Sequence, residues 1–180
     1  GTGVDYAVYS QSASGLGWLL TPATVCLAIP LYKQLHLLKK YGAAVFASIG
    51  SGVAASVVSI FLMCRLMGLS HVNYVTLLPK SITTAIGMGV SEEAGGIVTL
   101  TVMSIILTGV IGNVLGELVF RITGVRHPIA RGLALGTSAH AIGTAKALEL
   151  GEIEGAMSSL SIAVAGLMTV IAVPIAANLI

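Results

Sequence analysis

Charged residues are scarce in this sequence. Only 9% of its 180 residues are Asp, Glu, Lys or Arg, while 56% are hydrophobic and the mean hydropathy is +0.98. A soluble domain usually carries about 25% charged residues, so this chain has too few to cover a surface that faces water. The composition excludes an ordinary soluble domain. Long apolar runs without strand-like alternation predict an all-α, polytopic membrane protein.

Cysteines and metal-ligand patterns are also few. Cys26 and Cys64 both lie in apolar runs, which favours two buried small side chains over a disulfide. The four histidines are scattered and no CxxC pair is present, so no metal-site spacing can be recognised. No metal or cofactor is expected. A net charge of +2 gives no indication of a nucleic-acid partner.

The apolar runs divide the chain into predicted membrane spans. We expect a loop at residues 1–15, spans at 15–32, 42–63, 97–120 and 155–178, and basic connections at 33–40 and 121–131. The chain begins with Gly1 and not with Met, so we expect that N-terminal sequence is missing.

The basic connections predict how the spans are oriented. Residues 33–40 hold three lysines and residues 121–131 hold three arginines, which places both connections on the cytoplasmic side. Segment 66–91 must then start and end outside, and segment 132–148 must start and end inside. Each is predicted to be a discontinuous or re-entrant element. The elements 73–120 and 130–178 would form an inverted repeat, an architecture typical of alternating-access transporters.

The two predicted re-entrant elements contain similar sequences. Lys80-Ser-Ile-Thr-Thr-Ala-Ile-Gly87 aligns with Gly136-Thr-Ser-Ala-His-Ala-Ile-Gly143, so that Thr84 corresponds to His140. Both segments place glycine and hydroxyl side chains where an uninterrupted membrane helix would be apolar. Such paired, interrupted segments point to a transporter binding site near the middle of the membrane.

In the first segment, Pro79 interrupts the helix because it lacks an N–H donor and disfavours helical backbone at Leu78. Free amides at the start of the following half-helix, with Ser81, Thr83 and Thr84 beside them, suit a small carboxylate. Lys80 is the candidate counter-charge. The alternative is that its ammonium group reaches the outer interface.

In the second segment, Thr137, Ser138 and Thr144 supply hydroxyls, and His140 can bind a carboxylate or carry a coupled proton. The alternative is a structural histidine that is hydrogen-bonded between helices. Glu117, in the preceding span, is a second candidate for proton coupling, with a solvated interface carboxylate as the alternative. Coupling to Na⁺ also stays open.

These residues do not predict an enzyme. Ser138 and His140 are two positions apart and would point away from each other on a helix. The segment also lacks the GxSxG frame of a hydrolase nucleophile. The candidate substrate-binding residues are therefore taken as a transport site: Lys80, Ser81, Thr83, Thr84, Thr137, Ser138, His140 and Thr144.

Three motifs in these segments resemble the LrgB/CidB family of bacterial membrane proteins. They are Leu78-Pro-Lys-Ser-Ile-Thr-Thr84, Ala130-Arg-Gly-Leu-Ala-Leu-Gly-Thr-Ser-Ala-His-Ala-Ile-Gly-Thr144 and Glu154-Gly-Ala-Met-Ser-Ser159. The resemblance runs from about Gly17 to the C-terminus, and the plastidal glycolate/glycerate translocator of plants contains a similar domain. It implies that residues 1–180 form one LrgB-like domain that lacks about two N-terminal spans.

The resemblance implies two functions. The family members that are linked to transport, such as the plastidal translocator, imply a secondary transporter of small 2-hydroxy or 2-oxo monocarboxylates such as glycolate, glycerate or pyruvate. The bacterial names imply a holin-like or antiholin-like protein that modulates murein hydrolase activity and cell lysis with an LrgA/CidA-type partner. The paired polar segments favour the first. We expect a homo-oligomer in the bacterial inner membrane.

Overall fold

The computed structural model describes residues 15, 22, 26, 28–33 and 35–179. Every regular element in these ranges is helical, which confirms the all-α prediction. The elements are α3 (Ala28–Lys33), α4 (Leu35–Leu66), α5 (His71–Leu77), α6 (Thr84–Glu93), α7 (Val98–Thr123), α8 (Pro128–Leu150), α9 (Glu152–Ala176) and a final 3₁₀ turn, Ala177–Leu179. The predicted loop 1–15 and most of the predicted span 15–32 lie outside the described residues.

Three of the described helices are long and apolar enough to cross a membrane. They are Lys39–Leu66, Val98–Thr123 and Glu152–Leu179, each of 26 to 28 residues. At about 1.5 Å per residue, each exceeds the roughly 30 Å of a hydrocarbon core. The predicted spans 42–63, 97–120 and 155–178 each fall on one of these helices. The predicted basic connection 33–40 was wrong in form, because α4 already begins at Leu35 and carries Lys39 and Lys40 in its first turns.

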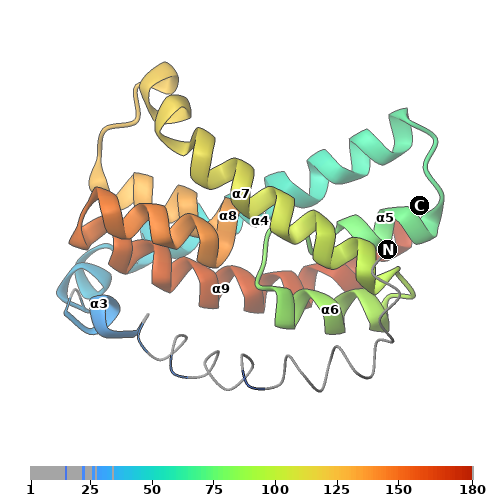
Figure 1. Ribbon diagram of the computed structural model, residues 1–180, viewed down its shortest axis with the longest axis horizontal. Helices are drawn as coiled ribbons and strands as arrows, with labels where there is room; N and C mark the ends of the chain where they lie inside the picture. Colours follow the sequence, from blue (N-terminus) through green and yellow to red (C-terminus); the bar gives the residue numbers. More distant parts are fainter. Residues whose placement is uncertain (1–14, 16–21, 23–25, 27, 34, 180) are drawn as a thin grey trace.

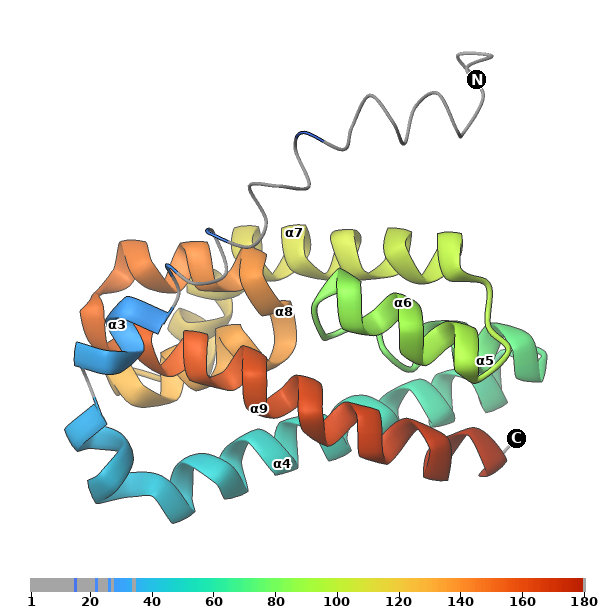
Figure 2. The same ribbon diagram turned by 90° about the horizontal axis from the view of Figure 1, so that it is seen from below.

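The three long helices alternate in direction. In Figure 2, α4 and α9 run from the α3 end of the molecule to the opposite end, and α7 runs in the reverse direction along the side of the molecule away from α4. The short helices α5 and α6 lie at the far end, whereas α8 lies at the α3 end (Figures 1 and 2). The two short elements therefore enter from opposite ends, as the charge pattern predicted.

The first re-entrant element is broken around Pro79. Helix α5 starts at Ser70, whose hydroxyl accepts a hydrogen bond from the Asn73 amide at 3.5 Å. It ends at Leu77, and α6 does not begin until Thr84. Leu78 keeps helical dihedrals (φ −50°, ψ −46°), so the expectation that Pro79 would disfavour helical backbone there was wrong. The helix ends here because Pro79 has no N–H to continue the hydrogen-bond ladder.

The second re-entrant element, α8, is a helical hairpin with its apex at His140. This residue has φ 43° and ψ −135°, the only positive φ at a non-glycine position in the described ranges. Leu135 and Ala147 belong to one buried cluster, although a straight helix would separate them by about 18 Å. The arms 128–139 and 141–150 must therefore fold back on each other.

Small residues allow the hairpin to pack closely between α7 and α9. A Cβ atom added at Gly132 or Gly136 would collide with the backbone of α9 at Glu154 or Ser158. On the other side, Gly112 packs against Ala139. Gly116 also lies against the first arm of α8, at Leu135, so the Gly112-x-x-x-Gly116 pattern of α7 serves packing within the chain.

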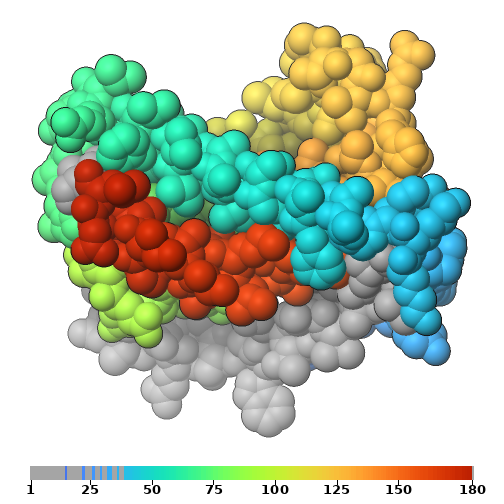
Figure 3. Space-filling view, turned by 180° about the vertical axis from the view of Figure 1, so that it is seen from behind, coloured from blue at the N-terminus to red at the C-terminus, as the bar shows by residue number. Residues whose placement is uncertain are grey.

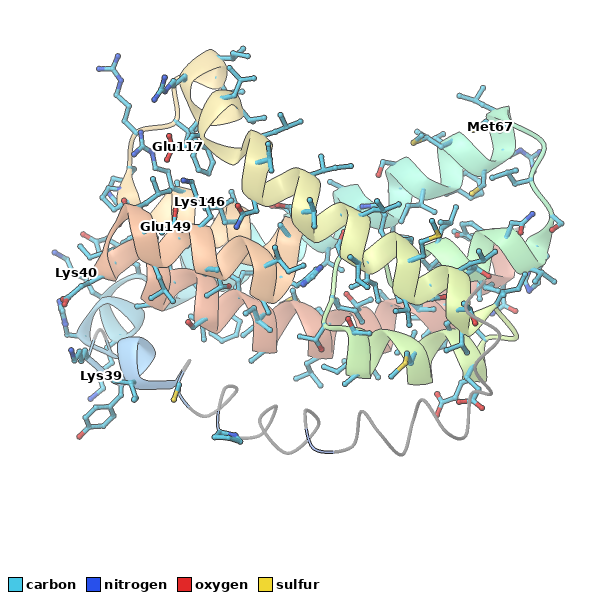
Figure 4. All side chains as sticks on the ribbon, viewed as in Figure 1. Lys39, Lys40, Met67, Glu117, Lys146 and Glu149 are labelled. Carbon is cyan, nitrogen blue, oxygen red and sulfur yellow. The ribbon has the colours of Figure 1, made fainter. Side chains whose placement is uncertain are left out.

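The side chains agree with the predicted orientation. Figure 4 shows Lys39 and Lys40 at the same end of the molecule as Lys146 and Glu149, whereas Met67 lies at the opposite end. One acidic residue is buried. Only 7% of Glu154 is exposed, because α9 begins at Glu152 and carries it against the hairpin.

Replacing Gly136 by alanine should destabilise the protein by about 1–3 kcal/mol, because the new methyl group would force the hairpin away from the α9 backbone. Gly89→Ala is the matched control, since no atom lies within 4 Å of a Cβ at that position in α6. Thermal unfolding in detergent should show a lower midpoint for Gly136→Ala alone. Equal midpoints for the two variants would contradict the close packing of α8 on α9.

Candidate functional site

The largest cavity of the described residues lies between α4 and the two broken elements. It has a volume of about 630 Å³. Its lining residues are Ser48, Gly52, Ala55, Ser56 and Ser59 of α4, Lys80 and Ser81 of the first break, and Ala130, Leu133, Ala134, Thr137 and Ser138 of the hairpin's first arm. The space-filling view shows a hollow between α4 and the segments of α7 and α8 (Figure 3). The cavity therefore joins both repeat elements.

Lys80 is the only charged residue among those that line this cavity. Its Nζ atom donates a hydrogen bond to Ser81 Oγ at 2.9 Å, and Ser81 Oγ lies 3.3 Å from Ser56 Oγ. These contacts place the Lys80 ammonium group beside the hydroxyls of Ser81 and Ser56, and a binding role for Lys80 stays a prediction. They also connect the first break to a membrane-spanning helix through hydroxyl groups.

Thr137 brings an unpartnered hydroxyl to the same place. Its Oγ1 atom is buried and has no hydrogen-bond partner in the described part of the chain. Gly52 of α4 lies against its methyl group, and a Cβ added at Gly52 would lie 2.8 Å from Thr137 Cγ2. A buried hydroxyl without a partner costs free energy, so it marks a position where a bound polar group would be stabilised.

Ser138 also lines the cavity, although its hydroxyl donates to the Ala134 carbonyl at 2.7 Å. Thr83 and Thr84 do not line it. Thr83 is the N-cap residue of α6, but its side chain makes no capping hydrogen bond. The structure therefore brings together Lys80, Ser81, Thr137 and Ser138, while Thr83 and Thr84 stand apart from this group.

His140 and Thr144 are engaged inside the protein. The His140 ring is 4% exposed, and its Nε2 atom donates to the Ile105 carbonyl at 2.9 Å. Thr144 Oγ1 lies 2.9 Å from the His140 carbonyl and 2.7 Å from Ser158 Oγ. These contacts describe the structural alternative for His140, a histidine that links two helices. A binding role for either residue stays a prediction.

Asn113 supports the apex of the hairpin. Its Nδ2 atom donates to the Ile142 carbonyl at 2.8 Å, across from α7 to α8. Ile142 lies at the start of the second arm, directly after the break at His140, so this hydrogen bond holds the apex of the hairpin to α7. Together with His140, this side chain fixes the broken backbone to α7 from both directions.

Glu117 lies in an ion-pair cluster away from the cavity. One of its carboxylate oxygens is 3.0 Å from Lys146 Nζ, and the other is 3.6 Å from Arg121. Lys146 also contacts Glu149 at 3.0 Å. The cluster sits at the end of the molecule where Figure 4 labels Glu117, Lys146 and Glu149, and it ties α7 to the second arm of α8. Proton coupling through Glu117 stays a prediction.

Sequence reasoning missed the contribution of α4 to the cavity. Its small residues were taken as a face for close helix packing. The signal was present, because Ser48, Gly52, Ser56 and Ser59 recur at helical spacing and so share one face. From the sequence alone, a helix face of serine and glycine that packs against another helix cannot be distinguished from one that lines a cavity.

Comparison with known proteins identifies relatives over almost the whole chain. The model of the LrgB-like family matches residues 1–179. The chain is 42% identical to the holin-like protein CidB of Staphylococcus epidermidis over 96% of its own length and 76% of that protein. It is 41% identical to the antiholin-like protein LrgB of Bacillus cereus over 92% of its own length and 72% of that protein. No solved structure matches.

Replacing Asn113 by leucine should destabilise the protein by about 1 kcal/mol, because the hydrogen bond that holds the start of the second arm of α8 to α7 would be lost. Asn178→Leu is the matched control, since that exposed amide also donates to a backbone carbonyl, that of Pro174, at 2.9 Å. Thermal unfolding in detergent measures both. An equal decrease in the unfolding midpoint for Asn178→Leu would show that the position of Asn113 near the helix break does not matter for stability.

Proposed function

The chain belongs to the LrgB-like family, and from its central cavity we propose that it is a secondary transporter of small monocarboxylates. The observation that carries the proposal is the meeting of both broken elements at a cavity with one cation, Lys80, and an unpartnered hydroxyl, Thr137. Irregular backbone is found at membrane depth where it lines a cavity or is buried in protein. Discontinuous helices around such a cavity are typical of transporter binding sites.

The chemistry of the cavity suits a small anion with a single negative charge. In a low-dielectric environment, one ammonium group balances one carboxylate, and hydroxyl groups supply the remaining hydrogen bonds. Lys80, Ser81 and Thr137 offer this combination from two different elements. A volume of about 630 Å³ is ample for a two- or three-carbon acid and leaves room for water. Glycolate, glycerate and pyruvate are the proposed substrates.

The names of the relatives support a second candidate function, and they support it more directly than they support transport. These names, holin-like CidB and antiholin-like LrgB, point to a holin-like or antiholin-like membrane protein. Under this second proposal the chain would modulate murein hydrolase activity and cell lysis with an LrgA/CidA-type partner. A holin-like activity needs a lesion or pore and no saturable site. Carboxylate or proton flux through the cavity would link the two functions.

Uptake measurements on proteoliposomes test the proposal. The protein should take up labelled glycolate or pyruvate with saturation, and Lys80→Met should reduce uptake by about tenfold or more, because the buried carboxylate would lose its counter-charge. Lys39→Met, at an exposed lysine in the first turns of α4, is the control and should leave uptake unchanged. Flux that rises linearly with substrate and ignores Lys80 would favour the pore-forming function.

The Thr137→Val variant tests substrate binding separately from protein stability. Because the Thr137 hydroxyl has no protein partner, its loss should leave the unfolding midpoint within about 1 °C or raise it slightly. The KM for uptake should nevertheless increase several-fold. An unchanged KM together with an unchanged midpoint would remove Thr137 from the substrate site. The control is Thr123→Val at the exposed end of α7, where the hydroxyl donates to the Val119 carbonyl.

A further inference from the structure

A second charged pocket lies at the predicted cytoplasmic end, outside the central cavity. Its volume is about 160 Å³, and its lining residues are Glu117, Phe120, Arg121, Arg131 and Leu150. The two arginines come from different elements, one from the end of α7 and one from the start of α8. A phosphate group between them would contact both elements at once.

Arg131 is held in a fixed position by its neighbours. Its Nε atom donates to the Val125 carbonyl at 3.0 Å, and its guanidinium group lies 5.7 Å from the centre of the Phe120 ring. Within the described ranges this is its only hydrogen bond, so both terminal amino groups remain available as donors. Arginine presents such donors in a planar fork that matches two phosphate oxygens.

The single carboxylate of this pocket is already neutralised. Glu117 lies 3.0 Å from Lys146 and 3.6 Å from Arg121, whose side chain is 79% exposed. The charged residues that line the pocket are thus two arginines, Arg121 and Arg131, and one carboxylate, Glu117, with which Lys146 also pairs from beside the pocket. The pocket keeps an excess of positive charge with which to attract an anion.

An apolar groove continues from the charged pocket toward the middle of the membrane. It has a volume of about 230 Å³ and shares Phe120 with the pocket. It lies between α7 and the first arm of α8, and its lining residues include Ile111, Leu115, Val119 and Leu135. The pair of sites therefore has a charged end near the interface and an apolar end at depth.

We propose that the charged pocket and the apolar groove together bind an anionic phospholipid of the cytoplasmic leaflet. Its phosphate lies between Arg121 and Arg131, and one acyl chain follows the groove. Basic pockets between helices on the cytoplasmic side suit anionic headgroups. A free phosphate would leave the groove unused, and a second copy of the chain would bring the same positive charge to the pocket. Bound there, the lipid would tie the hairpin to α7.

Lipid binding to the purified full chain tests this proposal. Phosphatidylglycerol added in detergent should raise the unfolding midpoint and remain bound in native mass spectrometry, whereas phosphatidylcholine and inorganic phosphate should do neither. Arg121→Gln should weaken phosphatidylglycerol binding several-fold, and Arg121→Gln with Arg131→Gln should weaken it by about tenfold or more. Because Arg121 is exposed, its single variant should fold even if the Arg131 variant does not.

Two further variants give the contrast. Lys39→Gln with Lys40→Gln removes two charges at the same end outside the pocket and should leave binding unchanged. Val119→Trp fills the groove and should weaken phosphatidylglycerol binding while both arginines remain. Equal binding of phosphatidylcholine, equal protection by inorganic phosphate, or an equal loss in the lysine variant would overturn the proposal. So would a lipid-independent dimer that the double arginine variant abolishes.

Discussion

Every backbone polar group at membrane depth needs a partner in the protein, and this requirement governs the rest of the structure. Two helices of this chain are broken inside the predicted membrane, one around Pro79 and one at His140. The second break is supported by α7: the His140 ring donates to the Ile105 carbonyl, and Asn113 donates to the Ile142 carbonyl. These two hydrogen bonds satisfy the polar side chains at the apex and fix the hairpin to α7.

This support depends on close approach between helices. Gly109 makes room for the His140 ring, since a Cβ added there would lie 2.8 Å from its Nε2 atom. Gly136 allows the first arm of the hairpin to lie on the α9 backbone near Ser158. Non-glycine residues at positive φ cost about 1–3 kcal/mol. His140 can hold its φ of 43° because its ring and the adjoining backbone are fixed by α7.

The sequence allowed the spans and the two inverted elements to be predicted, because charge bias and apolar length are properties of whole segments. Residues 33–40 and 121–131 were enough to place both ends of segment 132–148 on one side. Individual side-chain contacts could not be predicted in the same way. His140 aligns with Thr84 in sequence, yet its ring is buried against α7, and only the three-dimensional path of the hairpin determines that.

The cavity could be predicted only in part for a similar reason. Lys80, Ser81, Thr137 and Ser138 were expected at the site because they interrupt apolar segments, and the structure brings all four to one cavity. The wall formed by α4 was not expected, because its serines satisfy their hydroxyls within the helix and so resemble packing residues. Ser48 donates to the Ala44 carbonyl and Ser59 to that of Ser56.

The basic residue of the cavity and the basic residues at the predicted cytoplasmic end have different physical roles. Lys80 is partly buried and is the only charged residue in the lining of the cavity, where its neighbours include the hydroxyls of Ser81 and Ser56. Arg121, Arg131 and Lys146 stand among carboxylates at the end of the molecule, where each charge is partly balanced. A buried single charge discriminates between ligands by their charge, whereas a balanced cluster mainly fixes helices to one another and to the lipid. Transport selectivity should therefore depend on Lys80, and the cluster at the membrane interface should set how firmly the hairpin is held.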